Sequence, residues 1–167
     1  ISDEIHCDLV YKWYKHIPFA SISEEFAMNS MTCINPSKTF NIAGLRTAAI
    51  IIPDKYKKDQ VYESIVNNKA YGRNIFGTIA FETAYNECEY YAEQLVEYLE
   101  KNRQICIDYF EKEVPKIKLI KPEATYLFWL ACRELGFNEE ELDDFMFNKA
   151  KVGLNSGYTF GADGKGF

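Results

Sequence analysis

Lys38 lies in a run of small, hydroxyl and apolar residues that ends in an arginine, Asn35-Pro36-Ser37-Lys38-Thr39-Phe40-Asn41-Ile42-Ala43-Gly44-Leu45-Arg46. An acidic residue, Asp3, precedes the lysine by 35 positions, and Arg46 follows it by eight. A lysine amine can form a Schiff base with a carbonyl group, a carboxylate can pair with a pyridine nitrogen, and an arginine can neutralise a phosphate. Together these residue types predict a pyridoxal phosphate site in which Lys38 is the catalytic residue.

Each of these residues taken alone has a simpler explanation. Most lysines lie in exposed loops, where the amine is protonated and a poor nucleophile; burial favours the reactive neutral amine. Ser37 and Arg46 could meet one phosphate if the intervening loop folds back, or they could be a turn residue and a solvated charge. The combination with Asp3 favours the cofactor site over these alternatives.

Four neighbouring residues compete for roles around the cofactor ring. Asp3 is the candidate partner of the ring nitrogen, because a carboxylate there keeps the ring protonated and electron-withdrawing. Glu4, Asp8 or a structural cap are the alternatives. His6 could contact the ring hydroxyl, support Asp3, or serve the structure alone.

Composition limits the class of protein. The chain has 167 residues, 47% of them hydrophobic and 16% aromatic, which is enough for a packed core. Its net charge of −6 argues against a nucleic-acid partner, and no apolar run is long enough to predict a membrane span. The five cysteines are scattered and form no metal-binding spacing, so we expect no metal site, and reduced thiols in a cytoplasmic protein.

The pattern of apolar residues predicts an alternation of strands and helices. In the first part we expect a strand running into a polar loop at 1–8, a strand at 28–34, a central strand buried on both faces at 48–52, and a helix at 53–68. A long helical pattern at 78–113 should bend or cross between two domains, and Pro115 should end it.

The last part of the chain has a different character. Strands are expected at 116–120, 125–132 and 152–154, with a glycine-rich loop at 158–167. Asn138 and Glu141 predict a capping box, followed by a short helix that buries one apolar side.

Several motifs resemble a known enzyme family. Ser2-Asp3-Glu4-Ile5-His6-Cys7-Asp8 and the Lys38 run resemble the fold-type-I pyridoxal-phosphate enzymes of the class I/II aminotransferase superfamily. Within it, Asp3–Asp8 resembles the MalY/PatB branch, the cystathionine β-lyase and cystalysin-like C–S lyases. The resemblance continues through Gly72-Arg73-Asn74-Ile75-Phe76-Gly77, Glu123-Ala124-Thr125-Tyr126-Leu127-Phe128-Trp129 and Phe160-Gly161-Ala162-Asp163-Gly164-Lys165-Gly166-Phe167, and so covers almost the whole chain.

The resemblance implies a role for each candidate residue. Lys38 matches the Schiff-base lysine, Asp3 the ring-nitrogen aspartate, Ser37 a phosphate-contacting serine and Arg46 the phosphate arginine. His6 stands where many aminotransferases have a tyrosine near the ring hydroxyl. The sequence departs from the family at Asn35, where serine or threonine is usual, and Arg46 is more typical of aminotransferases than of the lyase branch.

The resemblance also implies the architecture. The fold is expected to be α/β, with residues 1–100 belonging to a large pyridoxal-phosphate domain built on a mostly parallel sheet, and residues 101–167 to a smaller C-terminal α/β domain. Ile1 opens directly into the acidic motif and Phe167 directly follows a glycine-rich loop, so we expect an internal part of a longer chain that is inactive alone. The phosphate loop, the aromatic residue stacked on the ring and the arginine for the substrate carboxylate should lie outside it.

The implied function is β-elimination from a small amino-acid substrate by a homodimeric C–S lyase, which gives pyruvate, ammonia and a thiol. The alternatives are an aminotransferase of the same superfamily and a pyridoxal-phosphate-fold sensing module of a transcription regulator. An aminotransferase shares the first half of the reaction, the removal of the α-proton by Lys38.

Overall fold

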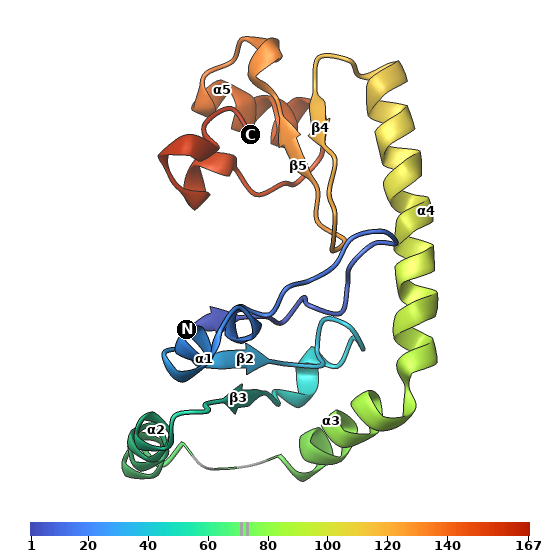
Figure 1. Ribbon diagram of the computed structural model, residues 1–167. Helices are drawn as coiled ribbons and strands as arrows, with labels where there is room; N and C mark the ends of the chain where they lie inside the picture. Colours follow the sequence, from blue (N-terminus) through green and yellow to red (C-terminus); the bar gives the residue numbers. More distant parts are fainter. Residues whose placement is uncertain (71, 73) are drawn as a thin grey trace. The chain divides into compact units, whose positions relative to one another are not determined.

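The structure is a computed structural model that describes residues 1–70, 72 and 74–167. Arg73 of the motif at 72–77 lies outside the described residues. The chain divides into two compact units, Ile1–Leu99 and Glu100–Phe167 (Figure 1). None of the helices in the described part of the chain combines the length and the apolar character that crossing a membrane requires.

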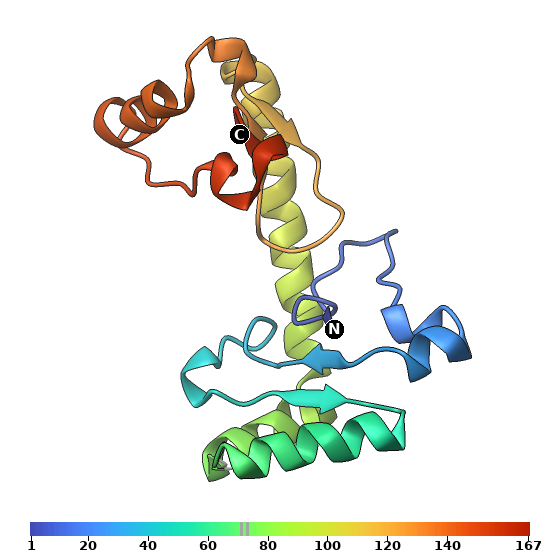
Figure 2. The same cartoon turned by 90° about the vertical axis from the view of Figure 1, so that its left-hand side faces the viewer.

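A three-stranded sheet forms the centre of the first unit. It consists of β1 (Ser2–Asp3), β2 (Thr32–Ile34) and β3 (Ala49–Ile51), in that order. β1 runs parallel to β2 with Asp3 opposite Cys33, and β3 runs antiparallel to β2 with Ile50 opposite Cys33. Figure 2 shows β2 and β3 side by side. The sheet of this chain is therefore mixed.

The prediction of a strand at 48–52 is confirmed, but its placement as a central, doubly buried strand is wrong for the described chain. β3 pairs only with β2 among the described residues, so it lies at the edge of the sheet. Ile50 and Ile51, which point to opposite faces of the sheet, are 48% and 49% exposed, so neither face of β3 is fully covered by the described part of the chain. An apolar run shows that a strand is suited to burial, but it does not show which neighbours the strand has.

Helices α1 (Glu24–Met28) and α2 (Lys55–Asn67) of the first unit begin at side-chain caps. α1 begins after Ser23, whose hydroxyl accepts from the Phe26 amide, and α2 begins after Asp54, whose carboxylate accepts from the Lys57 amide. A short 3-10 turn, η1 (Phe19–Ser21), precedes α1. The predicted helix at 53–68 is confirmed. The predicted strand at 28–34 is too long, because Met28 ends α1 and only Thr32–Ile34 pair.

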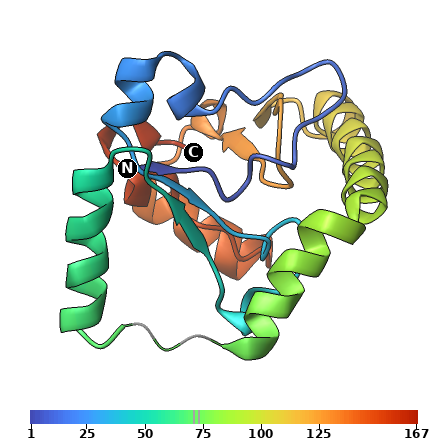
Figure 3. The same cartoon turned by 60° about the horizontal axis from the view of Figure 1, so that its bottom comes forward.

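The long helical pattern forms two helices. α3 (Ile75–Glu87) and α4 (Glu89–Glu113) are separated at Cys88, whose backbone leaves the helical region at φ −114° and ψ 26° (Figure 3). α4 ends two residues before Pro115 and passes from the first unit into the second. The prediction that this element bends or crosses between two units is confirmed.

The second unit contains a small antiparallel sheet and a capped helix. β4 (Lys118–Ile120) pairs with β5 (Trp129–Ala131), with Leu119 opposite Leu130. α5 (Glu139–Asp144) begins with the predicted capping box, in which Asn138 and Glu141 bond to each other's backbone amides, and continues as a π-helical turn, η4 (Phe145–Lys149). The strand predicted at 152–154 is wrong, because this segment has no paired neighbour within the described part of the chain.

The glycine-rich end of the chain folds back on itself. Two 3-10 turns, η5 (Gly157–Phe160) and η6 (Ala162–Gly164), follow one another, and the Gly157 amide donates to the Phe167 carbonyl at 2.9 Å. A Cβ on Gly157 would lie only 2.2 Å from the Gly164 carbonyl oxygen, so this approach requires glycine. A further 3-10 turn, η3 (Arg133–Leu135), follows β5.

Candidate active site

Asp3 and the loop that carries Lys38 begin at the same edge of the sheet. Asp3 ends β1, and Lys38 lies four residues after Ile34, the last residue of β2. Because β1 and β2 are parallel, their carboxyl ends meet at one edge, which is where open α/β sheets bind ligands. The topology thus brings together two candidate residues that are 35 positions apart in the sequence.

The charges of Lys38 and Asp3 both affect the pKa of His6. Burial lowers the pKa of His6, the positive charge of Lys38 lowers it further, and the negative charge of Asp3 partly opposes this. Charge interactions weaken with distance, so both charged groups lie in the neighbourhood of the imidazole. The lowered pKa favours the neutral form of this half-buried imidazole.

The Lys38 loop is fixed by its own backbone. The Phe40 amide donates to the Pro36 carbonyl at 2.8 Å, and the Ile42 amide donates to the Ser37 carbonyl at 3.2 Å. Asn35 accepts a hydrogen bond from the Ser37 amide at 2.6 Å. The asparagine that departs from the family pattern therefore shapes the turn before Lys38, and the Ser37 hydroxyl stays available for a ligand.

The backbone of Arg46 is fixed by the turn that precedes it, while its guanidinium makes no contact with the described residues that holds it in place. A short 3-10 turn, η2 (Ala43–Leu45), ends at Arg46 in the left-handed conformation, φ 47° and ψ 52°. The start of α3 lies against this turn, since Asn74 Nδ2 donates to the Leu45 carbonyl at 2.9 Å. The guanidinium is exposed and bonds to none of the described residues, so its predicted contact with phosphate stays a prediction.

The two acids that compete with Asp3 are already engaged. Glu4 is buried and accepts hydrogen bonds from the Ser2 hydroxyl at 2.9 Å and the Phe19 amide at 3.0 Å, and it lies 2.8 Å from His16 Nε2. Burial raises the pKa of Glu4, but the hydrogen bonds from His16 and Phe19 outweigh it and lower the pKa overall. Glu4 and His16 therefore serve the structure.

Asp8 is engaged as well, in a way that the sequence did not indicate. Asp8 Oδ2 accepts from the Thr39 hydroxyl at 3.0 Å and from the Tyr85 hydroxyl at 3.4 Å, and Oδ1 accepts from the Cys7 thiol at 3.5 Å. By contrast, Asp3 is exposed and forms no hydrogen bond or ion pair with the described residues. Of the three acids, Asp3 has its carboxylate available for a ligand.

The groups at this edge of the sheet fit pyridoxal phosphate. Lys38 is half-buried and, like Asp3, makes no hydrogen bond or ion pair within the part of the chain that the structure describes. An amine, a carboxylate and an imidazole at one sheet edge, followed by a free serine hydroxyl, match the imine, ring nitrogen, ring hydroxyl and phosphate of that molecule.

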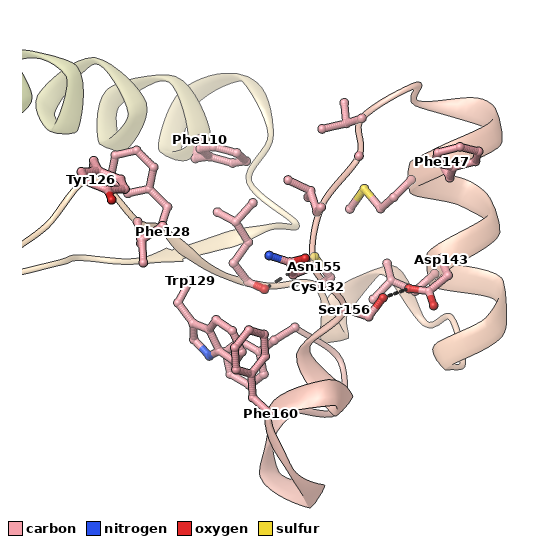
Figure 4. Close-up of a pocket in the computed structure, with 18 residues that line it drawn as sticks. Phe110, Tyr126, Phe128, Trp129, Cys132, Asp143, Phe147, Asn155, Ser156 and Phe160 are labelled. Carbon is pink, nitrogen blue, oxygen red and sulfur yellow. Dashed lines mark hydrogen bonds between the residues drawn. The ribbon is translucent and has the colours of Figure 1, made fainter. Parts of the chain in front are cut away.

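The second unit contains an apolar cavity of about 880 Å³ (Figure 4). Aromatic side chains dominate its wall, among them Phe128, Trp129 and Phe160, and the Trp129 and Phe160 rings meet edge to face at 5.4 Å. Asp143 accepts a hydrogen bond from Ser156 at its margin. The cavity contains no predicted site residue, and its lining comes entirely from residues 110–167.

The family model described as Aminotransferase class I and II matches residues 1–166. The chain belongs to this family. It is 44% identical to "Cystathionine beta-lyase PatB" of Bacillus subtilis over 167 residues, 100% of this chain and 43% of that protein. It is 34% identical to "Cystathionine beta-lyase" of Corynebacterium glutamicum over 163 residues, 96% of this chain and 42% of that protein.

Among solved structures, cystalysin from Treponema denticola, which contains a pyridoxal 5'-phosphate cofactor, superposes with a TM-score of 0.91 at 36% identity, covering 99% of this chain and 42% of that one. The predicted family and the α/β fold class are confirmed. The chain spans less than half the length of these relatives.

Proposed function

We propose that the protein is a pyridoxal-phosphate-dependent C–S lyase that eliminates a thiol from a small amino-acid substrate. The observation that supports the proposal is the parallel pairing of β1 and β2, which brings the segments of Asp3 and Lys38 to one edge of the sheet. The relatives named cystathionine beta-lyase support the reaction class. We assign the first unit to the large cofactor-binding domain and the second to the small domain.

The bound cofactor would supply electron withdrawal from the substrate α-carbon. Lys38 would hold it through Nζ, and the same Nζ, once released by the substrate amine, would take the α-proton. Asp3 would hold a proton on the ring nitrogen, which maintains that withdrawal.

The remaining candidates would bind and orient the cofactor. The His6 imidazole, whose lowered pKa favours the neutral form, can exchange a hydrogen bond with the ring hydroxyl without adding charge beside Asp3. The Ser37 hydroxyl would donate to a phosphate oxygen, and the Arg46 guanidinium would form two parallel bonds to the phosphate.

The elimination balances with one water molecule. With cystathionine as substrate, loss of the α-proton and cleavage of the Cβ–S bond release homocysteine, and hydrolysis of the remaining fragment gives pyruvate and ammonia. Lys38 Nζ is the acceptor of the α-proton and a donor for the departing thiolate. An aminotransferase instead returns that proton to the cofactor carbon, and Arg46, more typical of aminotransferases, favours this second candidate.

The test compares the two outcomes in the full-length protein. Pyruvate release from cystathionine without added keto acid should exceed amino transfer to 2-oxoglutarate by at least about tenfold, a difference of roughly 1.4 kcal/mol in barrier. Alanine, which has no leaving group on Cβ, is the matched control and should give no elimination. If amino transfer were faster than pyruvate release, the proposed function would be that of an aminotransferase and not that of a lyase.

We further propose that the full protein is a cytoplasmic homodimer. The five cysteines all lie in described segments and are free thiols, which suits a reducing compartment. Family members form dimers whose two sites lie at the subunit interface, and this chain resembles them along almost its whole length. Sedimentation equilibrium of the full-length protein should give twice the chain mass; a monomer that is fully active would contradict the dimer.

A further inference from the structure

Asp8 joins three separate segments of the first unit through one carboxylate. Its Oδ2 accepts from Thr39, the residue after Lys38, and from Tyr85 on α3, while its Oδ1 accepts from Cys7. The first two donors are 31 and 77 positions from Asp8 in the sequence. The carboxylate is therefore a tertiary link and not a local turn contact.

The bond to Thr39 fixes the neighbour of the candidate catalytic residue. Thr39 is 0% exposed, so without Asp8 its hydroxyl would have no solvent to bind. The turn that contains Thr39 is stiff, because the Phe40 amide bonds to Pro36 and the Ile42 amide bonds to Ser37. A shift of Thr39 would consequently move Lys38 with it.

On the other side, Asp8 belongs to the segment that carries Asp3 and His6. That segment is tightened by the Cys7 amide bonding to the Glu4 carbonyl and the Leu9 amide bonding to the His6 carbonyl, each at 3.0 Å. Leu9 anchors it in the core at 1% exposure. The strand pairing of β1 and β2 ends at Asp3 and Cys33, well before Lys38, so it does not fix the lysine by itself.

Tyr85 strengthens the link from a third direction. Its ring meets Phe40 edge to face at 5.6 Å, so α3 presses on the same turn that carries Lys38. Partial burial and the negative charge of Asp8 raise the pKa of Tyr85, which favours the protonated hydroxyl that donates to Asp8.

From these contacts we infer that Asp8 is a positioning residue, which acts through Thr39 to hold Lys38 in register with Asp3 and His6. The role rests on the proposed function of Lys38 as the cofactor-binding lysine. In this role Asp8 acts through its hydrogen bond to Thr39. Asp8 would thereby set the distance between Lys38, which takes the α-proton, and Asp3, which pairs with the ring nitrogen.

The test uses the cofactor-loaded full-length enzyme with Asp8→Ala, Thr39→Val and the conservative Thr39→Ser. Asp8→Ala and Thr39→Val should each lower kcat at least about tenfold and change KM less than about threefold, because a displaced base affects the chemical step. Both should also shift the pH midpoint of the bound cofactor's visible absorption by at least about half a unit. Thr39→Ser retains the hydroxyl and should match the wild type in kcat, KM and the pH midpoint of absorption.

Two comparisons separate positioning from stability. The double variant Asp8→Ala/Thr39→Val should be no slower than the slower single variant, since both remove one link. Asp54→Ala is the control for stability. It removes the carboxylate that caps α2 by accepting a 2.7 Å hydrogen bond from the Lys57 amide, outside the Lys38 loop. This variant should lower the thermal midpoint without changing kcat or the absorption midpoint.

The outcomes are decisive in each case. Wild-type kcat and absorption midpoint in Thr39→Val would overturn the inference, and so would effects confined to the thermal midpoint, as in Asp54→Ala. If Asp8→Ala does not fold, the Thr39→Val and Thr39→Ser pair still decides. If the loaded Lys38→Ala variant had the same visible absorption as the loaded wild-type enzyme, the proposed function would be wrong. The role of Asp8 would then be wrong as well.

Discussion

Gly77→Ala tests whether the start of α3 controls the position of Arg46. A Cβ at Gly77 would lie 2.9 Å from the Leu45 carbonyl oxygen and 3.1 Å from Thr47 Cβ, on either side of Arg46. The carbonyl has little room to yield, because it also accepts the hydrogen bond from Asn74. The substitution should therefore displace the segment that carries the guanidinium.

Two opposing effects set the size of the change. Overpacking by a methyl group costs about 1–3 kcal/mol, while replacing a helical glycine by alanine gains up to about 1 kcal/mol. The clash prevails, with a net cost of about 1–2 kcal/mol. If this cost falls on the phosphate contact of Arg46, the dissociation constant of the cofactor should rise about fivefold to thirtyfold.

The assay is a titration of the full-length apoenzyme with pyridoxal phosphate, followed by absorbance. Gly44→Ala is the matched control, because Gly44 belongs to the turn before Arg46 and a Cβ there meets nothing within 4 Å. It should change the affinity less than about twofold. In an Arg46→Ala background, Gly77→Ala should have little further effect. An unchanged affinity in Gly77→Ala alone, or an equal loss in both backgrounds, would refute the reasoning.

Three further outcomes are expected. Asp3→Asn should retain the cofactor but lose most of the turnover, because an unprotonated ring withdraws electrons poorly; activity within a few-fold of wild type would assign this role to another acid. Glu4→Gln should destabilise the protein by about 1.5–3 kcal/mol at pH 7. Because folding lowers the pKa of Glu4 from 4.5, that loss should shrink in thermal scans as the pH falls below 4.5 through the folded value, and a loss independent of pH would contradict the bond to His16. Burial and the charge of Asp8 raise the pKa of Cys7 to about 12, so iodoacetamide at pH 8 should label Cys7 far more slowly in the native enzyme than in urea, and equal rates would contradict this environment.

Local features of the fold could be predicted from the sequence. The capping box at Asn138 and Glu141 depends on residues within one helical turn, so sequence pattern was enough. The helix predicted from Pro53 was found, but it begins at Lys55 after the Asp54 cap, so Pro53 lies outside its first turn. The break at Cys88 could not be predicted in the same way, because neither glycine nor proline marks it. The long pattern still indicated that one straight helix was too long for a single unit.

Features that depend on distant neighbours could not be predicted. The apolar run at 48–52 predicted a strand, but the position of β3 at the sheet edge depends on which strands pair. The segment at 152–154 has the residues of a strand and lacks a partner among the described residues. The pattern of apolar residues shows which side of a segment can be buried, but the pairing of a strand depends on residues elsewhere in the chain.

The candidate site follows the same division. Lys38, Asp3, His6, Ser37 and Arg46 were selected by residue type, spacing and family resemblance, and the parallel pairing of β1 with β2 brings the segments that carry Asp3 and Lys38 to one edge of the sheet. Asp8 was weighed in the sequence only as a rival of Asp3. Two of its partners, Thr39 and Tyr85, lie so far along the chain that no local pattern connects them to Asp8.

The most direct test of the account is the position of the covalent bond between protein and cofactor. The full-length enzyme is loaded with pyridoxal phosphate, reduced with borohydride, digested and mapped by mass spectrometry. The pyridoxyl group should be found on Lys38, and Lys38→Ala should carry none. A label on a different lysine, or no label in the wild-type enzyme, would contradict the central claim that this loop holds the cofactor.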